Sequence, residues 1–132
     1  MKIMRLLLER KFIFIAVVWT VLITFLSLIS MIATPSFMMK LPFKDKIVHF
    51  LFYFILVTLW SFSFNQKTFQ LRFKILVAAI FYGIIIEILQ DTITVSRTAD
   101  FFDVIANSLG ALIAFFAFPY FAKVFYSTKI KN

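Results

Sequence analysis

Residues 87–110 read EILQDTITVSRTADFFDVIANSLG, a polar stretch that lies between two long apolar segments. Four of the six acidic residues of the chain belong to it, namely Glu87, Asp91, Asp100 and Asp103. A charged side chain at the centre of a bilayer costs roughly 2.5–3.5 kcal/mol on insertion scales. Charged side chains beside apolar segments need ion-pair or hydrogen-bond partners, or they take part in function. We therefore expect a functional site in this stretch.

The composition of the chain indicates a small membrane protein. Its 132 residues leave room for one domain, which we predict over residues 1–132. Hydrophobic residues make up 63% of the chain, well above the roughly 45–50% of soluble domains. The net charge of +8 comes from basic residues that flank apolar segments, a pattern typical of topology signals and contacts with anionic lipids. We therefore expect membrane lipids, and no nucleic acid, as partners.

Four apolar segments predict transmembrane helices, at about residues 12–33, 47–64, 75–95 and 104–122. The first segment is long enough to cross a hydrocarbon core of about 30 Å. It exceeds the apolar region of a signal peptide and lacks a small-x-small cleavage site, which favours a helix that is retained. Because the connections are short, neighbouring helices should pack antiparallel. The predicted fold is an all-α, four-helix transmembrane bundle with up-down connectivity.

Basic residues predict the orientation of this bundle. Ten of the fourteen lie in the N-terminal segment, the second loop and the C-terminal tail. The other four, including Arg97, lie in the first and third loops. Since cytoplasmic loops carry the excess of lysine and arginine, both termini are predicted to be cytoplasmic. The polar stretch then lies at the outer side of the membrane.

Polar side chains recur at helical spacing on three of the predicted helices. Residues three or four apart share a helix face, and antiparallel packing would bring these faces together at one depth. The sequence therefore predicts a shared polar pocket in the outer leaflet. Its candidate residues are Asp45, His49, Glu87, Gln90, Asp91, Arg97, Asp103 and Asn107.

Each candidate also has a structural interpretation. Glu87 could hold the bundle together by pairing with His49 or Arg97. Arg97 could neutralise neighbouring carboxylates, or its planar guanidinium could clamp a phosphate or carboxylate. Asp100 is expected to cap the fourth helix, and Gly110 to permit close helix approach.

Sequence motifs of known chemistry do not decide the function. Carboxylates and His49 offer donors suited to magnesium, manganese or zinc. The HExxH motif and the usual Cys/His spacings are missing, so we predict no metal and no other cofactor. Neither a GxSxG motif nor a phosphate-binding loop occurs. Catalytic residues therefore stay unassigned, and enzymatic activity is left open.

The segments DKIVHFLFYFILVTLW, at residues 45–60, and EILQDTITVSRTADFFDVIANSLGALIA, at residues 87–114, together resemble the VanZ-like family of integral membrane proteins. The residues that match the family pattern are Asp45, Lys46, His49, Phe50, Glu87, Gln90, Arg97, Asp103, Asn107 and Gly110. The resemblance implies a multi-pass protein of the bacterial cytoplasmic membrane. The namesake of the family is associated with low-level resistance to the glycopeptide teicoplanin.

Three functions are compatible with these observations. The first is a membrane protein whose pocket binds, or helps to modify, a cell-envelope component, with a lipid-linked precursor or an amphipathic glycopeptide as its partner. The second is a membrane-embedded hydrolase or transferase that acts on a lipid-linked substrate, with Glu87 as general acid or base. The third is a purely structural polar cluster.

Overall fold

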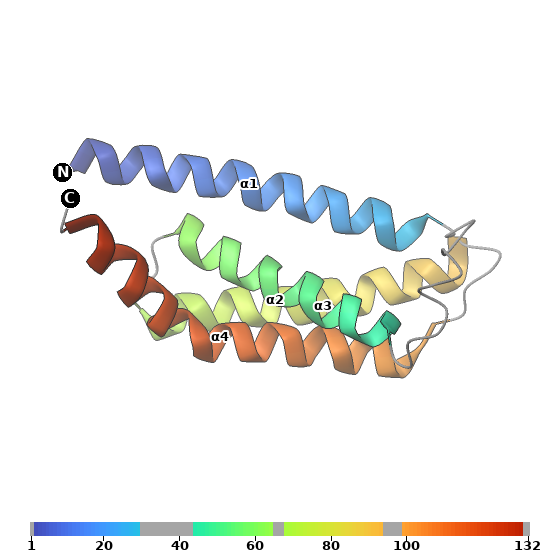
Figure 1. Ribbon diagram of the computed structural model, residues 1–132. Coiled ribbons are helices and arrows are strands. Elements are labelled where there is room, and N and C mark those ends of the chain that lie inside the picture. The colour runs from blue at the N-terminus through green and yellow to red at the C-terminus, as the bar shows by residue number, and fades with distance from the viewer. Residues whose placement is uncertain (1, 30–43, 65–67, 94–98, 131–132) are drawn as a thin grey trace.

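A computed structural model of the protein describes residues 2–29, 44–64, 68–93 and 99–130 (Figure 1). These residues form four helices and no strand. The helices are α1 (Lys2–Leu28), α2 (Lys44–Ser63), α3 (Phe69–Ile93) and α4 (Phe101–Ile130). Each is long and apolar enough to cross a membrane. The predicted all-α bundle of four membrane-spanning helices is thus confirmed.

The helices differ in extent from the apolar segments that predicted them. Helix α1 begins well before residue 12, and α4 continues well past residue 122. Hydropathy marks the part of a helix that lies in lipid, whereas the basic flanking segments continue the same helices into the polar region. Residues 30–33 of the first predicted segment lie outside the described residues.

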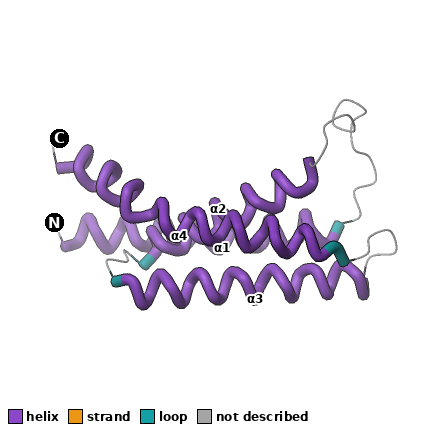
Figure 2. The backbone as a smooth tube through the Cα atoms, turned by 90° about the horizontal axis from the view of Figure 1, so that it is seen from below, coloured by secondary structure: helices purple, strands orange, loops and turns teal. Residues whose placement is uncertain are grey.

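Helix α4 contains a proline in its interior, Pro119. Proline removes one backbone hydrogen bond and its ring clashes with the preceding turn, so it kinks a helix. The last turns of α4 accordingly bend away from the direction of its first part (Figures 1 and 2).

The helices alternate in direction, so that the two chain ends lie at the same end of the molecule (Figure 1). The start of α2, the end of α3 and the start of α4 lie together at the opposite end. The termini therefore share one side of the membrane, as up-down connectivity requires. That this side is the cytoplasm remains a prediction from the loop charges.

Helices α2 and α4 approach closely because of Gly110. A Cβ atom at this position would lie 2.9 Å from the carbonyl carbon of Phe50 and would also overlap its carbonyl oxygen. The predicted role of Gly110 in close helix approach is therefore confirmed. The buried hydrophobic core includes small and large side chains of all four helices: Ile23, Tyr53, Leu56, Val57, Leu76, Ala79, Ala111, Ala114 and Phe115.

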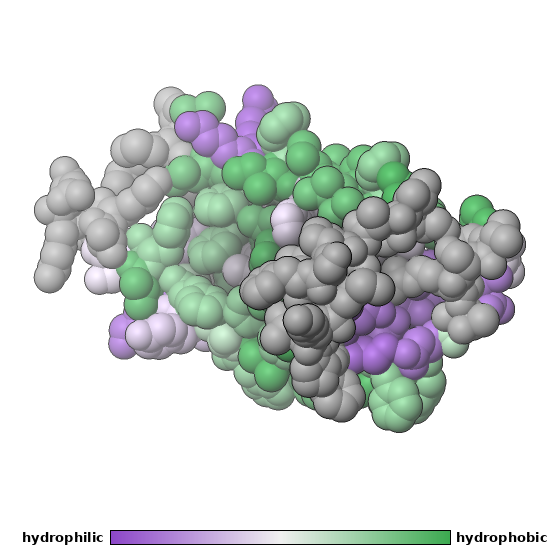
Figure 3. Space-filling model, turned by 45° about the vertical axis from the view of Figure 1, so that its right-hand side comes forward, coloured by the Kyte–Doolittle hydropathy of each residue, from purple (hydrophilic) through white to green (hydrophobic). Residues whose placement is uncertain are grey.

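The outer surface of the bundle is apolar. Large hydrophobic side chains, for example Phe14, Phe81 and Phe116, are mostly exposed, and hydrophobic residues dominate much of the face shown in Figure 3. Lipid offers apolar helices no hydrophobic drive to associate, so packing and hydrogen bonds must hold them together. Helix α1 is attached in this way, since the Trp19 indole donates to the Phe52 carbonyl (3.1 Å) and the Trp60 indole to the Thr20 hydroxyl (3.1 Å).

Candidate functional site

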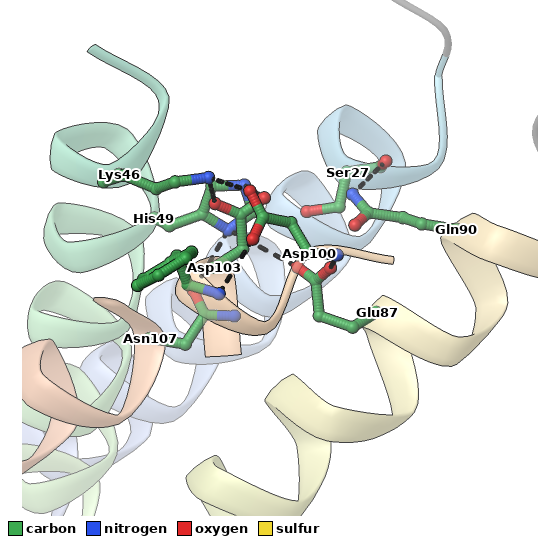
Figure 4. A network of polar contacts seen from close by, with 9 residues as sticks. Ser27, Lys46, His49, Glu87, Gln90, Asp100, Asp103 and Asn107 are labelled. Atoms are coloured by element: carbon green, nitrogen blue, oxygen red, sulfur yellow. Dashed lines mark hydrogen bonds and ion pairs between the residues drawn. The ribbon is translucent and has the colours of Figure 1, made fainter. Parts of the chain in front are cut away.

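His49 lies at the centre of a buried polar cluster, at the end of the bundle where α2 and α4 begin and α3 ends (Figure 4). Its Nδ1 atom lies 3.1 Å from Asn107 Oδ1 and 3.9 Å from Glu87 Oε1. Its Nε2 atom lies 3.6 Å from Asp103 Oδ2. Each of these four residues is buried, with at most 5% of its surface exposed. Helices α2, α3 and α4 thus place polar groups in one shared, buried space.

Lys46 joins this cluster, although its sequence context indicated only a loop charge and a residue of the family pattern. Its ammonium group forms ion pairs with Asp100 Oδ2 and Asp103 Oδ1. The Asp103 side chain is 5% exposed, whereas the side chains of Lys46 and Asp100 are 26% and 40% exposed. Lys46 precedes His49 by three residues on α2 and therefore shares its helix face. That spacing is the signal that could have revealed its role.

Asp100 caps α4 as predicted. Its Oδ1 atom accepts a hydrogen bond from the Phe102 amide (2.8 Å), and its carbonyl accepts one from the Asp103 amide (2.9 Å). The Lys46 ammonium, followed by the Phe102 amide, lowers the pKa of Asp100 below its ordinary value of 3.8. Both groups bind the ionised carboxylate better than the protonated one.

The lowered pKa of Asp100 predicts a dependence of stability on pH. Since the folded state favours the ionised carboxylate, its contribution is fully present above pH 3.8 and is lost as pH falls through the lowered pKa. Asn caps helices about as well as Asp, so Asp100→Asn removes the charge and keeps the cap. Thermal melting in detergent should show a steeper loss of stability below pH 4 in the parent than in Asp100→Asn. Parallel curves would contradict this prediction.

Helix α1 reaches the site through its backbone. The buried Gln90 side chain of α3 donates from Nε2 to the Ser27 carbonyl (2.7 Å). The last four carbonyls of a helix have no partner within it, and Ser27 directly precedes the end of α1 at Leu28. This contact leaves no signal in the sequence of α1, because a backbone carbonyl belongs to every residue. Gln90 therefore ties α1 to α3 beside the cluster.

The remaining predicted residues lie at the exposed edge of the cluster, its rim, or outside the described residues. Asp45 and Asp91 are exposed, and Asp91 Oδ1 accepts a hydrogen bond from the Ala99 amide (3.2 Å). Glu87 Oε2 accepts one from the Asp100 amide (3.4 Å), which links the end of α3 to the start of α4. Arg97 lies outside the described residues.

A bundle of four apolar helices with ionisable side chains buried at one end defines a multi-pass membrane protein with a polar site. A family model described as VanZ/LLP1 matches residues 11–123. Because the match covers most of the chain, the protein belongs to the VanZ/LLP1 family. The resemblance seen in residues 45–114 is thereby confirmed.

Comparison with curated proteins gives one relative to report, an uncharacterized protein of the fission yeast Schizosaccharomyces pombe. It is 36% identical over 78 residues, which cover 58% of this chain and 47% of the relative. The chain thus matches about half the length of this relative. No solved structure matches the chain.

Proposed function

We propose that the polar cluster binds the polar part of a lipid-linked molecule of the cell envelope, or of an amphipathic glycopeptide, in the outer leaflet of a bacterial cytoplasmic membrane. The observation that supports this proposal is the burial of His49, Glu87, Asp103 and Asn107 together in a membrane bundle. Ionisable residues within membrane segments are costly and typically mark binding or transport sites.

The cluster combines groups of both charges that suit a polar ligand. Carboxylates of Glu87 and Asp103 are buried beside His49, and the Lys46 side chain remains 26% exposed next to them. The carboxylates suit hydroxyl and ammonium groups of a ligand, while Lys46 and Arg97 suit its phosphate.

The exposure of the side chains indicates from which side a ligand would enter the cluster. Asp45 is exposed, and Lys46 and Asp100 retain 26% and 40% of their side-chain surface. The residues around His49 are buried beneath them. A hydrophilic patch lies beside the apolar surface at this end of the molecule (Figure 3). The headgroup of a lipid whose tail remains in the bilayer would therefore contact the exposed residues of the rim before it reaches His49.

A lipid-selective thermal shift tests this proposal. We expect polyprenyl phosphate to raise the melting temperature of the parent in phosphatidylcholine nanodiscs more than phosphatidylglycerol does. The Arg97→Ala and His49→Gln variants should lose most of this selectivity, whereas Lys123→Ala, at the opposite end of the bundle, should keep it. Equal shifts for all lipids, or the same selectivity in all variants, would contradict the proposal.

A second candidate function is hydrolysis or transfer on a lipid-linked substrate. The observation that favours it is the position of His49 between Glu87 and Asp103, at 3.9 and 3.6 Å. A buried imidazole between two carboxylates can move protons as a general acid or base. Turnover of polyprenyl phosphate or phospholipid in the same nanodiscs, abolished in a folded Glu87→Gln variant, would establish this activity. Absence of turnover across these substrates would leave binding as the function.

The family resemblance extends the binding proposal to teicoplanin. If the site holds an envelope precursor or the glycopeptide itself, expression in a teicoplanin-susceptible bacterium should raise the inhibitory concentration of the drug. The Arg97→Ala variant, expressed at the same level, should not. Equal inhibitory concentrations for parent, variant and empty vector would refute this extension and leave lipid binding to its own test.

A further inference from the structure

We propose that His49 Nε2, together with one carboxylate oxygen each from Asp45 and Asp103, binds a divalent transition-metal ion. One nitrogen or oxygen ligand atom from each of the three residues lies within 4.8 Å of the other two. Asp45 and His49 are one turn apart on α2, and Asp103 lies in the first turn of α4. One imidazole with two carboxylates suits zinc or manganese better than calcium, which prefers oxygen ligands alone.

The orientation of the His49 ring supports this proposal. An amide oxygen can only accept a hydrogen bond, so Nδ1 donates to Asn107 Oδ1 at 3.1 Å. In a neutral imidazole, Nε2 then keeps its lone pair. This atom faces Asp103 Oδ2, also an acceptor, at 3.6 Å, which is longer than a hydrogen bond. A cation placed between these two acceptors would turn their repulsion into attraction.

The distances agree with a shared ion. Two ligands at about 2.1 Å from a tetrahedral metal lie about 3.4 Å apart, close to the 3.6 Å between His49 Nε2 and Asp103 Oδ2. Lys46 holds the other oxygen of Asp103 and so aims Oδ2 at the imidazole. Asp45 is exposed, and its carboxylate oxygen, within 4.8 Å of the other two ligand atoms, closes the site on its exposed side.

The surroundings supply what a metal site needs beyond its ligands. Histidine ligands typically donate a hydrogen bond from their second ring nitrogen to an oxygen that fixes the tautomer. Asn107 Oδ1 is this acceptor for His49 Nδ1. The two carboxylates among the three ligands favour a divalent cation over a monovalent one. Three protein ligands leave a fourth position open, where a phosphate oxygen of the ligand would coordinate. That last role rests on the proposed function, whereas metal binding itself does not.

This inference departs from the sequence analysis, which predicted no metal. The ligands come from two helices far apart in the chain, a spacing that no short metal motif contains. The competing explanation is a proton, because a doubly protonated His49 would donate to both Asn107 and Asp103. An experiment must therefore distinguish a metal ion from a proton at Nε2.

Manganese provides the probe. Mn²⁺ titrated into the protein in phosphatidylcholine nanodiscs, without added lipid ligand, should saturate at one ion per chain. Its pulsed electron paramagnetic resonance should show ¹⁴N coupling from an imidazole, and His49→Gln should remove that coupling. Asp45→Asn should weaken binding at least tenfold, and Asn107→Ala by roughly 10–100-fold, as for other partners of metal-bound histidines. Glu9→Gln, which alters a carboxylate on α1 at the opposite end of the bundle, should bind as the parent does.

Three results would overturn the inference. They are the lack of saturable Mn²⁺ binding, bound Mn²⁺ without ¹⁴N coupling, and unchanged affinity in Asp45→Asn. A ¹⁵N spectrum with both His49 nitrogens protonated at neutral pH, with and without Mn²⁺, would assign the site to a proton instead. A lipid-selective thermal shift that persists in EDTA would leave the proposed function intact in each of these cases.

Discussion

Gly110→Ala should prevent the normal packing of α2 against α4. The added methyl group would overlap the carbonyl oxygen of Phe50 and lie 2.9 Å from its carbonyl carbon. These are backbone atoms of a helix, which cannot rotate away as a side chain can. Overpacking typically lowers the free energy of unfolding by about 1–3 kcal/mol. We expect a loss of at least about 3 kcal/mol here, because the overlap is with backbone atoms.

Gly83→Ala is the matched control for this prediction. A Cβ atom at Gly83 would lie 3.1 Å from a ring carbon of Tyr53 and 3.4 Å from Asn107, so only side chains must shift. Alanine is also favoured over glycine within helices by about 1 kcal/mol, which offsets the crowding. Reversible unfolding in mixed micelles should therefore separate the two variants clearly. Equal stabilities would show that the contact between α2 and α4 is looser than described.

Lys46→Met should destabilise the protein by about 3 kcal/mol, because it leaves the buried Asp103 carboxylate without its cation. The same unfolding assay measures the loss. Lys123→Met, which changes an exposed lysine on α4, should alter stability by less than about 0.5 kcal/mol.

A second substitution distinguishes the lost charge pair from lost packing. If Lys46 acts by neutralising Asp103, then Asp103→Asn should cost less in the Lys46→Met background than in the parent. The coupling should reach about 1–3 kcal/mol, as for residues in one ion-pair network. Additive losses would show that Lys46 and Asp103 act independently.

The sequence predicted the helices well because the relevant signals are local. Uninterrupted hydropathy marks each span, and spacings of three or four residues place Asp45 with His49, and Asp103 with Asn107, on shared helix faces. Up-down connectivity follows from short connections. The end of the bundle at which the polar residues gather could therefore be predicted from their depth alone.

The pairing within the site could not be predicted in the same way. Lys46 meets Asp100 and Asp103 across more than fifty residues of sequence, and Gln90 meets Ser27 across 63. Such contacts depend on how far each helix is rotated and shifted, which hydropathy does not determine. The Ser27 contact also uses a backbone carbonyl, so no side-chain pattern could reveal it.

Cysteine crosslinking tests most directly whether three helices share one polar site. The chain has no native cysteine, so pairs can be introduced without background. In native membranes, a short bifunctional thiol reagent should bridge His49→Cys to Asn107→Cys, and His49→Cys to Glu87→Cys. Mass spectrometry would then show one bridging reagent per chain. The control pair His49→Cys with Ile105→Cys, which lies near the same depth on another face of α4, should carry two separate adducts. Separate adducts in both test pairs would contradict the shared site.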